Sequence, residues 1–341
     1  MTGKRGLVAN LFGRLGATAA LGALRLKFSD GVTILAYHRV LDVPNEDEFP
    51  FDIELVSASV IQFKQQMEYI RAHYQPITFA TLLQYLDRGE KPPQGAAIIT
   101  FDDGFADNYH NAFPVLRQLD MPATIFLSTG YIDSRETFWY EKLSYAVMTT
   151  RANIVVTPAL GSLKISSNTR SRRELMACVV SKLKLVANDV RLASLEDLYA
   201  QLLPSYKWPH DDRSGPVTWG QVKEMSANNI EFGSHSVTHP VLSRVSLNKL
   251  EFEVEHSKHR IESELQKPVQ VIAYPVGGVE AFDDNVRAAV KKAGYRLGVS
   301  YIPGIERPDQ WDIYALRRVH IERYVNTHFF KAMLAVPEIF I

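Results

Sequence analysis

Short hydrophobic runs alternate with longer amphipathic segments along most of this chain. Seven runs have the length of buried strands, at residues 31–40, 96–101, 122–129, 230–236, 269–278, 295–300 and 315–321. Helical periodicity appears between several of them, at residues 57–73, 111–120, 246–266 and 283–294. In the first of these helices Val60, Phe63, Met67 and Ile70 share one face. Strands that alternate with helices predict a parallel sheet or barrel with helices outside it.

The alternation stops between residues 131 and 215, where the pattern favours helices around one short extended piece. The simplest interpretation is an insertion: residues 31–130 and 216–330 form one domain, and residues 131–215 are inserted into it. Trp139 and Tyr140 lie near the start of this segment, where they could shape a substrate groove or anchor the insert.

Residues 1–30 have a different pattern. Lys4 and Arg5 precede an alanine-rich apolar segment, as in a signal peptide, but Arg14 interrupts it. The uninterrupted apolar piece, residues 15–24, is too short to span a bilayer, which takes about 20 residues. We therefore expect an amphipathic helix that packs on the domain or lies on a membrane surface. The corresponding expectation for location is cytoplasmic or peripheral to the membrane, with export left open.

Composition and charge narrow the class of protein. In the 341 residues, 46% are hydrophobic and 22% charged, as in folded globular proteins. Lys plus Arg equal Asp plus Glu at 38 each, so the net charge does not favour a nucleic-acid partner. The single cysteine, Cys178, excludes an internal disulfide and a multi-cysteine zinc site, and we expect it to be a small buried residue.

Two acids, Asp102 and Asp103, directly follow the hydrophobic run at residues 96–101, and Gly104 follows them. Functional groups of parallel α/β folds gather at the carboxyl ends of the strands. Successive residues at a strand end point in different directions, so one acid could bind a metal while the other holds a proton. A helix N-cap or a turn is the structural alternative, because Asp and Gly are favoured there too.

A histidine pair follows another predicted strand. His235 and His239 are four residues apart, so both imidazoles can face one ion if the segment coils into a helical turn. Two histidines and one carboxylate suit zinc with open positions for water, or iron, cobalt or nickel.

The motifs TFDDG, residues 100–104, and HSVTHP, residues 235–240, resemble those of the NodB-homology polysaccharide deacetylases, carbohydrate esterase family four. The resemblance runs from Val32 to about Arg323. It implies a distorted (β/α)7 barrel, here with a mainly helical insertion. It also implies that Asp102 is the catalytic base and that Asp103, His235 and His239 hold a divalent metal, zinc before cobalt, nickel or iron.

The third family motif departs from the usual pattern. An arginine that braces the base is missing from AYPVGG, residues 273–278, which is similar to the exopolysaccharide and poly-N-acetylglucosamine deacetylase subgroup. The family pattern gives the Tyr274 backbone N–H a part in holding the oxyanion. Arg317 or Arg318 could replace the missing arginine, and we favour Arg318.

The general acid is the last catalytic role for which the sequence offers candidates. The subgroup is similar to a circularly permuted arrangement with a YH pair on the first strand, which makes His38 the candidate. His320 is the rival, and the structural alternative for His38 is a core histidine beside Tyr37.

The resemblance implies a metal-dependent hydrolase that removes N-acetyl groups from amino sugars of a polysaccharide or exopolysaccharide precursor. Its partner would be an N-acetylated glycan or glycolipid, with peripheral membrane contact through the N-terminal helix and no nucleic acid. One alternative is a deacylase or deformylase of a lipid-linked amino sugar. Another is a catalytically silent glycan-binding protein, to which the missing arginine gives weight. A ferrous oxygenase is disfavoured because the usual close His-x-Asp pair is lacking.

Overall fold

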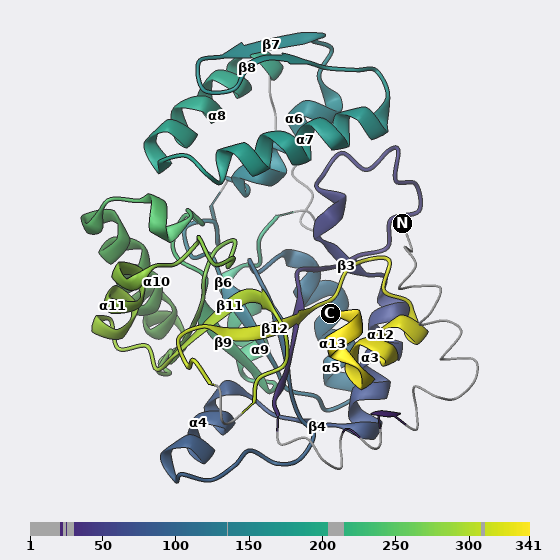
Figure 1. Cartoon of the computed structure of the whole chain (residues 1–341), viewed down its shortest axis with the longest axis vertical. Coiled ribbons are helices and arrows are strands. Elements are labelled where there is room, and N and C mark those ends of the chain that lie inside the picture. The colour runs from purple at the N-terminus through teal and green to yellow at the C-terminus, as the bar shows by residue number, and fades with distance from the viewer. Residues whose placement is uncertain (1–20, 23–24, 26–30, 135, 204–214, 308–310) are drawn as a thin grey trace.

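The structure is a computed structural model, shown in Figure 1, and it describes residues 21–22, 25, 31–134, 136–203, 215–307 and 311–341. The amphipathic helix predicted over residues 1–30 lies almost wholly outside these residues. Within the described part of the chain, no helix is both long enough and apolar enough to cross a membrane.

Seven parallel strands close into a barrel. In spatial order they are β1 (Thr33–Tyr37), β12 (Leu316–His320), β11 (Leu297–Pro303), β10 (Val271–Ala273), β9 (Ile230–Ser234), β6 (Ala123–Leu127) and β5 (Ala96–Phe101). The barrel closes because β5 pairs in turn with β1, in a register that runs from Thr33 opposite Ala97 to Tyr37 opposite Phe101. A short strand, β4 (Gln75–Pro76), adds to the start of β5. The predicted (β/α)7 barrel is confirmed.

Helices cover the outside of the barrel and one of its ends (Figure 1). They are α3 (Val60–His73), α4 (Phe79–Asp87), α5 (Phe113–Gln118), α9 (Trp219–Ser226), α10 (Leu247–Leu265), α11 (Asp284–Lys292), α12 (Thr327–Ala335) and α13 (Pro337–Phe340). Shorter pieces are β2 (Arg39–Val40), β3 (Val56–Ala58), the 3-10 turns Ile53–Leu55 and Leu242–Arg244, and a π turn at Asn108–Ala112. Local sequence determines where α3 begins, because Ser59 is its N-cap and forms a capping box with Gln62.

The alternation of side chains along each strand divides the core into two layers. Leu35 and Ile99 pack outward, in the cluster that the α3 residues Phe63 and Met67 join. Ile34 and Ile98 point the other way, into a cluster shared with other strands and with Phe79, Leu82 and Leu83 of α4. Helix α4 therefore closes the amino-terminal end of the barrel, and the site must lie at the opposite end.

The predicted insertion lies over that opposite end (Figure 1). It contains α6 (Trp139–Thr149), the antiparallel hairpin of β7 (Ile154–Thr157) and β8 (Gly161–Lys164), α7 (Thr169–Leu183) and α8 (Asn188–Leu202). These elements have their own apolar cluster, which includes Leu143, Val179 and Leu198. The domain bounds proposed from the sequence stay predictions. The expectation that Cys178 is buried is wrong, because it lies on the solvent face of α7.

Candidate metal and catalytic site

A cavity of about 240 Å³ opens where the carboxyl ends of the barrel strands meet the insertion. Asp102, Asp103, His235 and His239 line it, as does His38. Sequence reasoning selected all five, from segments almost 200 residues apart, and the closed barrel brings them to one rim.

The turn after β5 explains why the two adjacent acids face different groups. Asp102 continues the sheet, since its N–H donates to the Tyr37 carbonyl at 2.9 Å. Asp103 and Gly104 then both adopt left-handed backbone, with φ of 73° and 80°. A Cβ on residue 104 would lie 2.7 Å from Leu127 Cδ2, so glycine is required there for space as well as for conformation.

Asp103, His235 and His239 form a buried cluster in which one ligand atom of each lies within 4.8 Å of the others. Asp103 Oδ1 lies 3.2 Å from His239 Nε2 and 3.5 Å from His235 Nε2. This carboxylate oxygen is buried and makes no hydrogen bond with any described residue. An oxygen left unsatisfied between two imidazole nitrogens is what a cation site requires, so the three residues fit a divalent metal.

Protonation in this cluster also suits a metal. His235 Nδ1 lies 2.7 Å from the Ala273 carbonyl, which can only accept, so Nδ1 carries the proton and Nε2 offers its lone pair. Burial lowers the pKa of His235 to about 4, which keeps the ring neutral. For Asp103, burial acts to raise the pKa, but the neighbouring His239 and His235 outweigh it and hold the pKa well below its usual range.

The histidine loop is held from α10 and from the insertion, and it is not helical. Ser236 and His239 have left-handed backbone, with φ of 67° and 54°. Glu253 of α10 accepts hydrogen bonds from the backbone N–H groups of Val237 and Thr238, at 2.7 and 2.8 Å. The loop therefore brings both imidazoles to Asp103 through left-handed backbone, and the helical turn expected from the spacing of the two histidines does not form.

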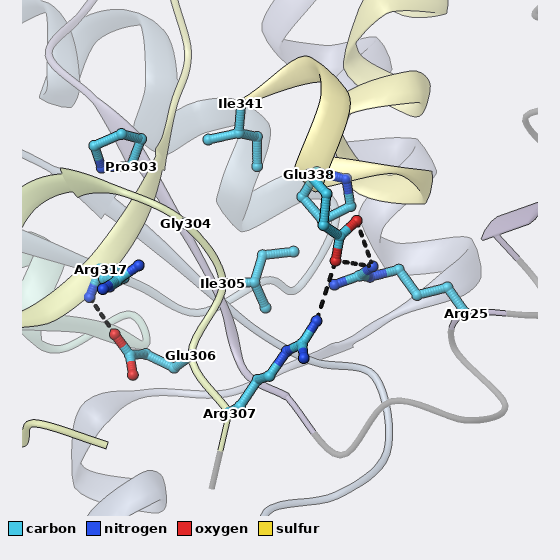
Figure 2. A pocket seen from close by; sticks show the side chains of 10 residues that line it. Arg25, Pro303, Gly304, Ile305, Glu306, Arg307, Arg317, Glu338 and Ile341 are labelled. Atoms are coloured by element: carbon cyan, nitrogen blue, oxygen red, sulfur yellow. Dashed lines mark hydrogen bonds and ion pairs between the residues drawn. The ribbon is translucent and has the colours of Figure 1, made fainter. Parts of the chain in front are cut away.

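Arg318 binds Asp102 with both terminal nitrogens. Each of two guanidinium N–H groups donates to one carboxylate oxygen at 2.7 Å, and Nε donates to the Ser300 carbonyl at 2.8 Å. Burial raises the pKa of Asp102, but the Arg318 charge leads the opposing effects, and together they hold the pKa below its usual value. Of the two arginines suggested by the sequence, Arg318 thus occupies the bracing position. Arg317 points to a separate surface pocket beside Glu306 (Figure 2).

The two candidate acids lie in different environments. His38 lines the cavity, is 18% exposed and places Nε2 4.0 Å from Asp102 Oδ2. His320 stacks on Tyr301, with ring centroids 3.6 Å apart. Burial, followed by the charge of Arg318, lowers the pKa of His320 to about 3. His38 rather than His320 is therefore placed to meet a substrate.

Tyr274 lines the cavity, but its backbone N–H is not free for the predicted part in holding the oxyanion. Its backbone N–H already donates to the Val299 carbonyl at 3.0 Å, as part of the pairing of β10 with β11. Its hydroxyl donates to the Tyr314 carbonyl at 2.9 Å. Two residues later Val276 has φ of 67° and lines the cavity. Among the described residues the N–H groups of Val276 and Gly277 have no acceptor, and of these two residues Val276 lines the cavity.

The insertion adds three residues to the cavity, and of these the sequence had singled out Tyr140 alone, as one that could shape a substrate groove. The Tyr140 hydroxyl is buried and has no hydrogen-bond partner in the described part of the chain. Its ring lies 5.2 Å from that of His239, measured between centroids. Val180 and Lys184, from α7 and its C-cap, also line the cavity. The only sequence signal for these residues was the aromatic pair at the start of the insertion.

Comparison with known proteins gives one family. The family model for polysaccharide deacetylase matches residues 89–298. The Bacillus subtilis protein YxkH, whose name assigns it provisionally to the polysaccharide deacetylases, is 23% identical over 261 residues, 76% of this chain and 64% of YxkH. The match therefore spans less than two thirds of that relative. The poly-beta-1,6-N-acetyl-D-glucosamine N-deacetylase of Staphylococcus epidermidis is 26% identical over 222 residues, 61% of this chain and 74% of the relative.

Solved structures show the same fold. The Streptococcus pyogenes deacetylase PplD, in complex with acetate, superposes with a TM-score of 0.57 at 20% identity, covering 87% of this chain and 94% of PplD. IcaB from Ammonifex degensii also gives 0.57, at 18% identity, covering 90% of this chain and 97% of IcaB. At these identities the likeness describes the barrel and carries no substrate with it.

Proposed function

The chain belongs to the polysaccharide deacetylase family, and from that premise we propose that it removes N-acetyl groups from amino-sugar residues of a polysaccharide. The proposal rests on one observation: two adjacent acids have different neighbours. Asp103 faces two histidines, and Asp102 is bound by Arg318. The two acids therefore offer a metal ligand and a base on the two sides of one cavity.

Asp103, His235 and His239 would hold the metal. Zinc suits a donor set of two imidazoles and one carboxylate best, and cobalt, nickel and iron can take the same set. When bound, such a cation supplies Lewis acidity, which polarises a carbonyl group and makes water more acidic.

Asp102 is the base that takes a proton from the attacking water. A buried carboxyl without a partner would become protonated, so the Arg318 charge keeps Asp102 ionised and able to accept. The two parallel hydrogen bonds also fix the direction of its oxygens. Water oxygen then bonds to the acetamide carbon as its proton passes to Asp102.

His38 is the proton donor for the leaving nitrogen. When the carbon–nitrogen bond breaks, the nitrogen takes the electron pair and needs a proton, and His38 reaches the cavity beside Asp102. The Val276 N–H is a backbone donor that could reach the carbonyl oxygen as it gains negative charge, because Val276 lines the cavity. The products are acetate and the free amine of the sugar.

The finer substrate follows from the Staphylococcus relative, whose name specifies β-1,6-linked poly-N-acetylglucosamine. We take oligomers of that polymer as the substrate to test. The alternative of a catalytically silent glycan-binding protein loses its main support, because Arg318 supplies the positive charge that the third motif lacks.

The test is acetate release from β-1,6-linked N-acetylglucosamine oligomers by metal-stripped protein, resupplied separately with zinc, cobalt or nickel. We expect no release from the stripped protein and restored release with metal. An N-formylated amino sugar, assayed for formate, runs in parallel. Formate release without acetate release would replace the deacetylase by a deformylase, and metal binding without either product would contradict hydrolysis.

A further inference from the structure

A second cavity adjoins the catalytic cavity beneath the insertion. Its volume is about 570 Å³, larger than the catalytic cavity itself. Asp52, Glu54, Val180 and Lys184 line both cavities and so form the boundary between them. The two cavities are therefore neighbours, and a sugar chain bound at the metal ligands would lie next to this second space.

The walls of the second cavity combine charged and apolar surfaces. Lys184 contributes a cation that makes no hydrogen bond or ion pair with any described residue, and Asp52 contributes a carboxylate beside it. Met176 and Val180 of α7 contribute apolar surface. A sugar ring has hydroxyls around its edge and C–H groups on its faces, so this mixture suits a saccharide. The charged residues of the lining nearly balance, which suits a neutral sugar; the acids are Asp52, Glu54 and Glu174 and the cations are Arg173 and Lys184.

The walls are held in place before any ligand arrives. Arg173 of α7 donates to the carbonyl of Phe49 at 2.9 Å, which joins the insertion to the loop that leads to Asp52. The Asp52 N–H donates at 2.8 Å to Glu141, a buried residue of α6 that also accepts from Arg39 at 2.9 Å. A cavity braced in this way requires little ordering on binding, which favours affinity.

We propose that this second cavity is a saccharide subsite, which binds the neutral N-acetylhexosamine next to the residue being deacetylated, with Lys184 donating hydrogen bonds to it. The proposal rests on the proposed function. It makes the insertion a determinant of substrate length: the enzyme prefers oligomers because the adjoining sugar binds between α7 and residues 52–54.

The experiment blocks the cavity from an exposed position. Ala177 lines the second cavity but not the catalytic one, and its position on α7 is exposed, so Ala177→Trp fills the space without disturbing the core. Cys178→Trp is the matched control, since the next residue is also exposed and lines neither cavity. Lys184→Met removes the proposed donor.

The readout is the ratio of kcat/KM for a β-1,6-linked N-acetylglucosamine tetramer to kcat/KM for N-acetylglucosamine. We expect this ratio to fall about tenfold or more in Ala177→Trp and in Lys184→Met, and to keep its wild-type value in Cys178→Trp. An unchanged ratio in Ala177→Trp would overturn the subsite.

A binding measurement separates this proposal from the proposed function. Calorimetric titration of the tetramer is carried out on Asp102→Asn and on Asp102→Asn combined with Ala177→Trp. Weaker binding in the double variant supports the subsite even where the wild type releases no acetate, a result that would contradict only the deacetylase. Equal binding in both variants contradicts the subsite even where acetate release is normal.

Discussion

Replacing Arg318 with glutamine removes the positive charge from Asp102 and leaves a carboxyl buried without a cationic brace. The two hydrogen bonds that are lost each measure 2.7 Å, and both side chains are at most 3% exposed. Removing one partner of such a buried pair costs about 3–5 kcal/mol of folding free energy. We expect kcat/KM at neutral pH to fall about 100-fold or more, the scale of a positioned general base.

The pH dependence gives the sharper result. In the wild type the pKa of Asp102 lies below its usual value, because the effects led by Arg318 outweigh burial. Asp102 therefore stabilises the fold at pH values above its unfolded-state pKa of about 4, and this contribution is lost as the pH falls through the folded-state pKa. In Arg318→Gln burial acts with less opposition, the pKa rises, and the acidic limb of the rate profile moves to higher pH. The free energy of unfolding of Arg318→Gln therefore falls furthest below that of the wild type at neutral pH, and the difference becomes smaller as the pH falls.

The assay measures acetate release and urea unfolding from pH 4 to pH 9, with bound zinc measured in each sample. Arg317→Gln is the matched control, because Arg317 lies next in sequence but lines the separate pocket of Figure 2. The reasoning is refuted if Arg318→Gln keeps the wild-type acidic limb while losing activity, since Arg318 would then act by some route other than the ionisation of Asp102.

Three further predictions concern neighbouring residues. His38→Ala should lose most of its turnover, whereas His320→Phe should retain it, because only His38 lines the cavity; steady-state acetate release compares them. Tyr140→Phe should lower kcat without lowering thermal stability, since its buried hydroxyl has no partner to lose among the described residues; a fall in both would make Tyr140 structural. Glu253→Gln should weaken zinc affinity about 10–100-fold by loosening the histidine loop, and a competition titration with a chelator measures this.

Parts of the site could be predicted from sequence because their geometry is local. Asp102 and Asp103 follow a strand and share one turn, and His235 and His239 share one loop, so each pair needs only its own segment to be recognised. Arg318 lies 216 residues from Asp102, and only the closed barrel decides between it and Arg317.

The errors have physical causes of the same kind. Tyr274 belongs to the sheet through its amide, and the chain turns into left-handed backbone two residues later, which no pattern in AYPVGG indicates. Lys184 reaches the cavity only because the insertion folds back over the barrel (Figure 1), and a helical segment of ordinary composition carries no signal of that path.

The central claim is that Asp102 takes the proton while its neighbour Asp103 binds the metal. The most direct test is zinc stoichiometry and acetate release measured on the same samples of wild type and Asp102→Asn. We predict one zinc per chain in both proteins and acetate release in the wild type alone. Zinc-dependent acetate release at the wild-type rate in Asp102→Asn would contradict the account.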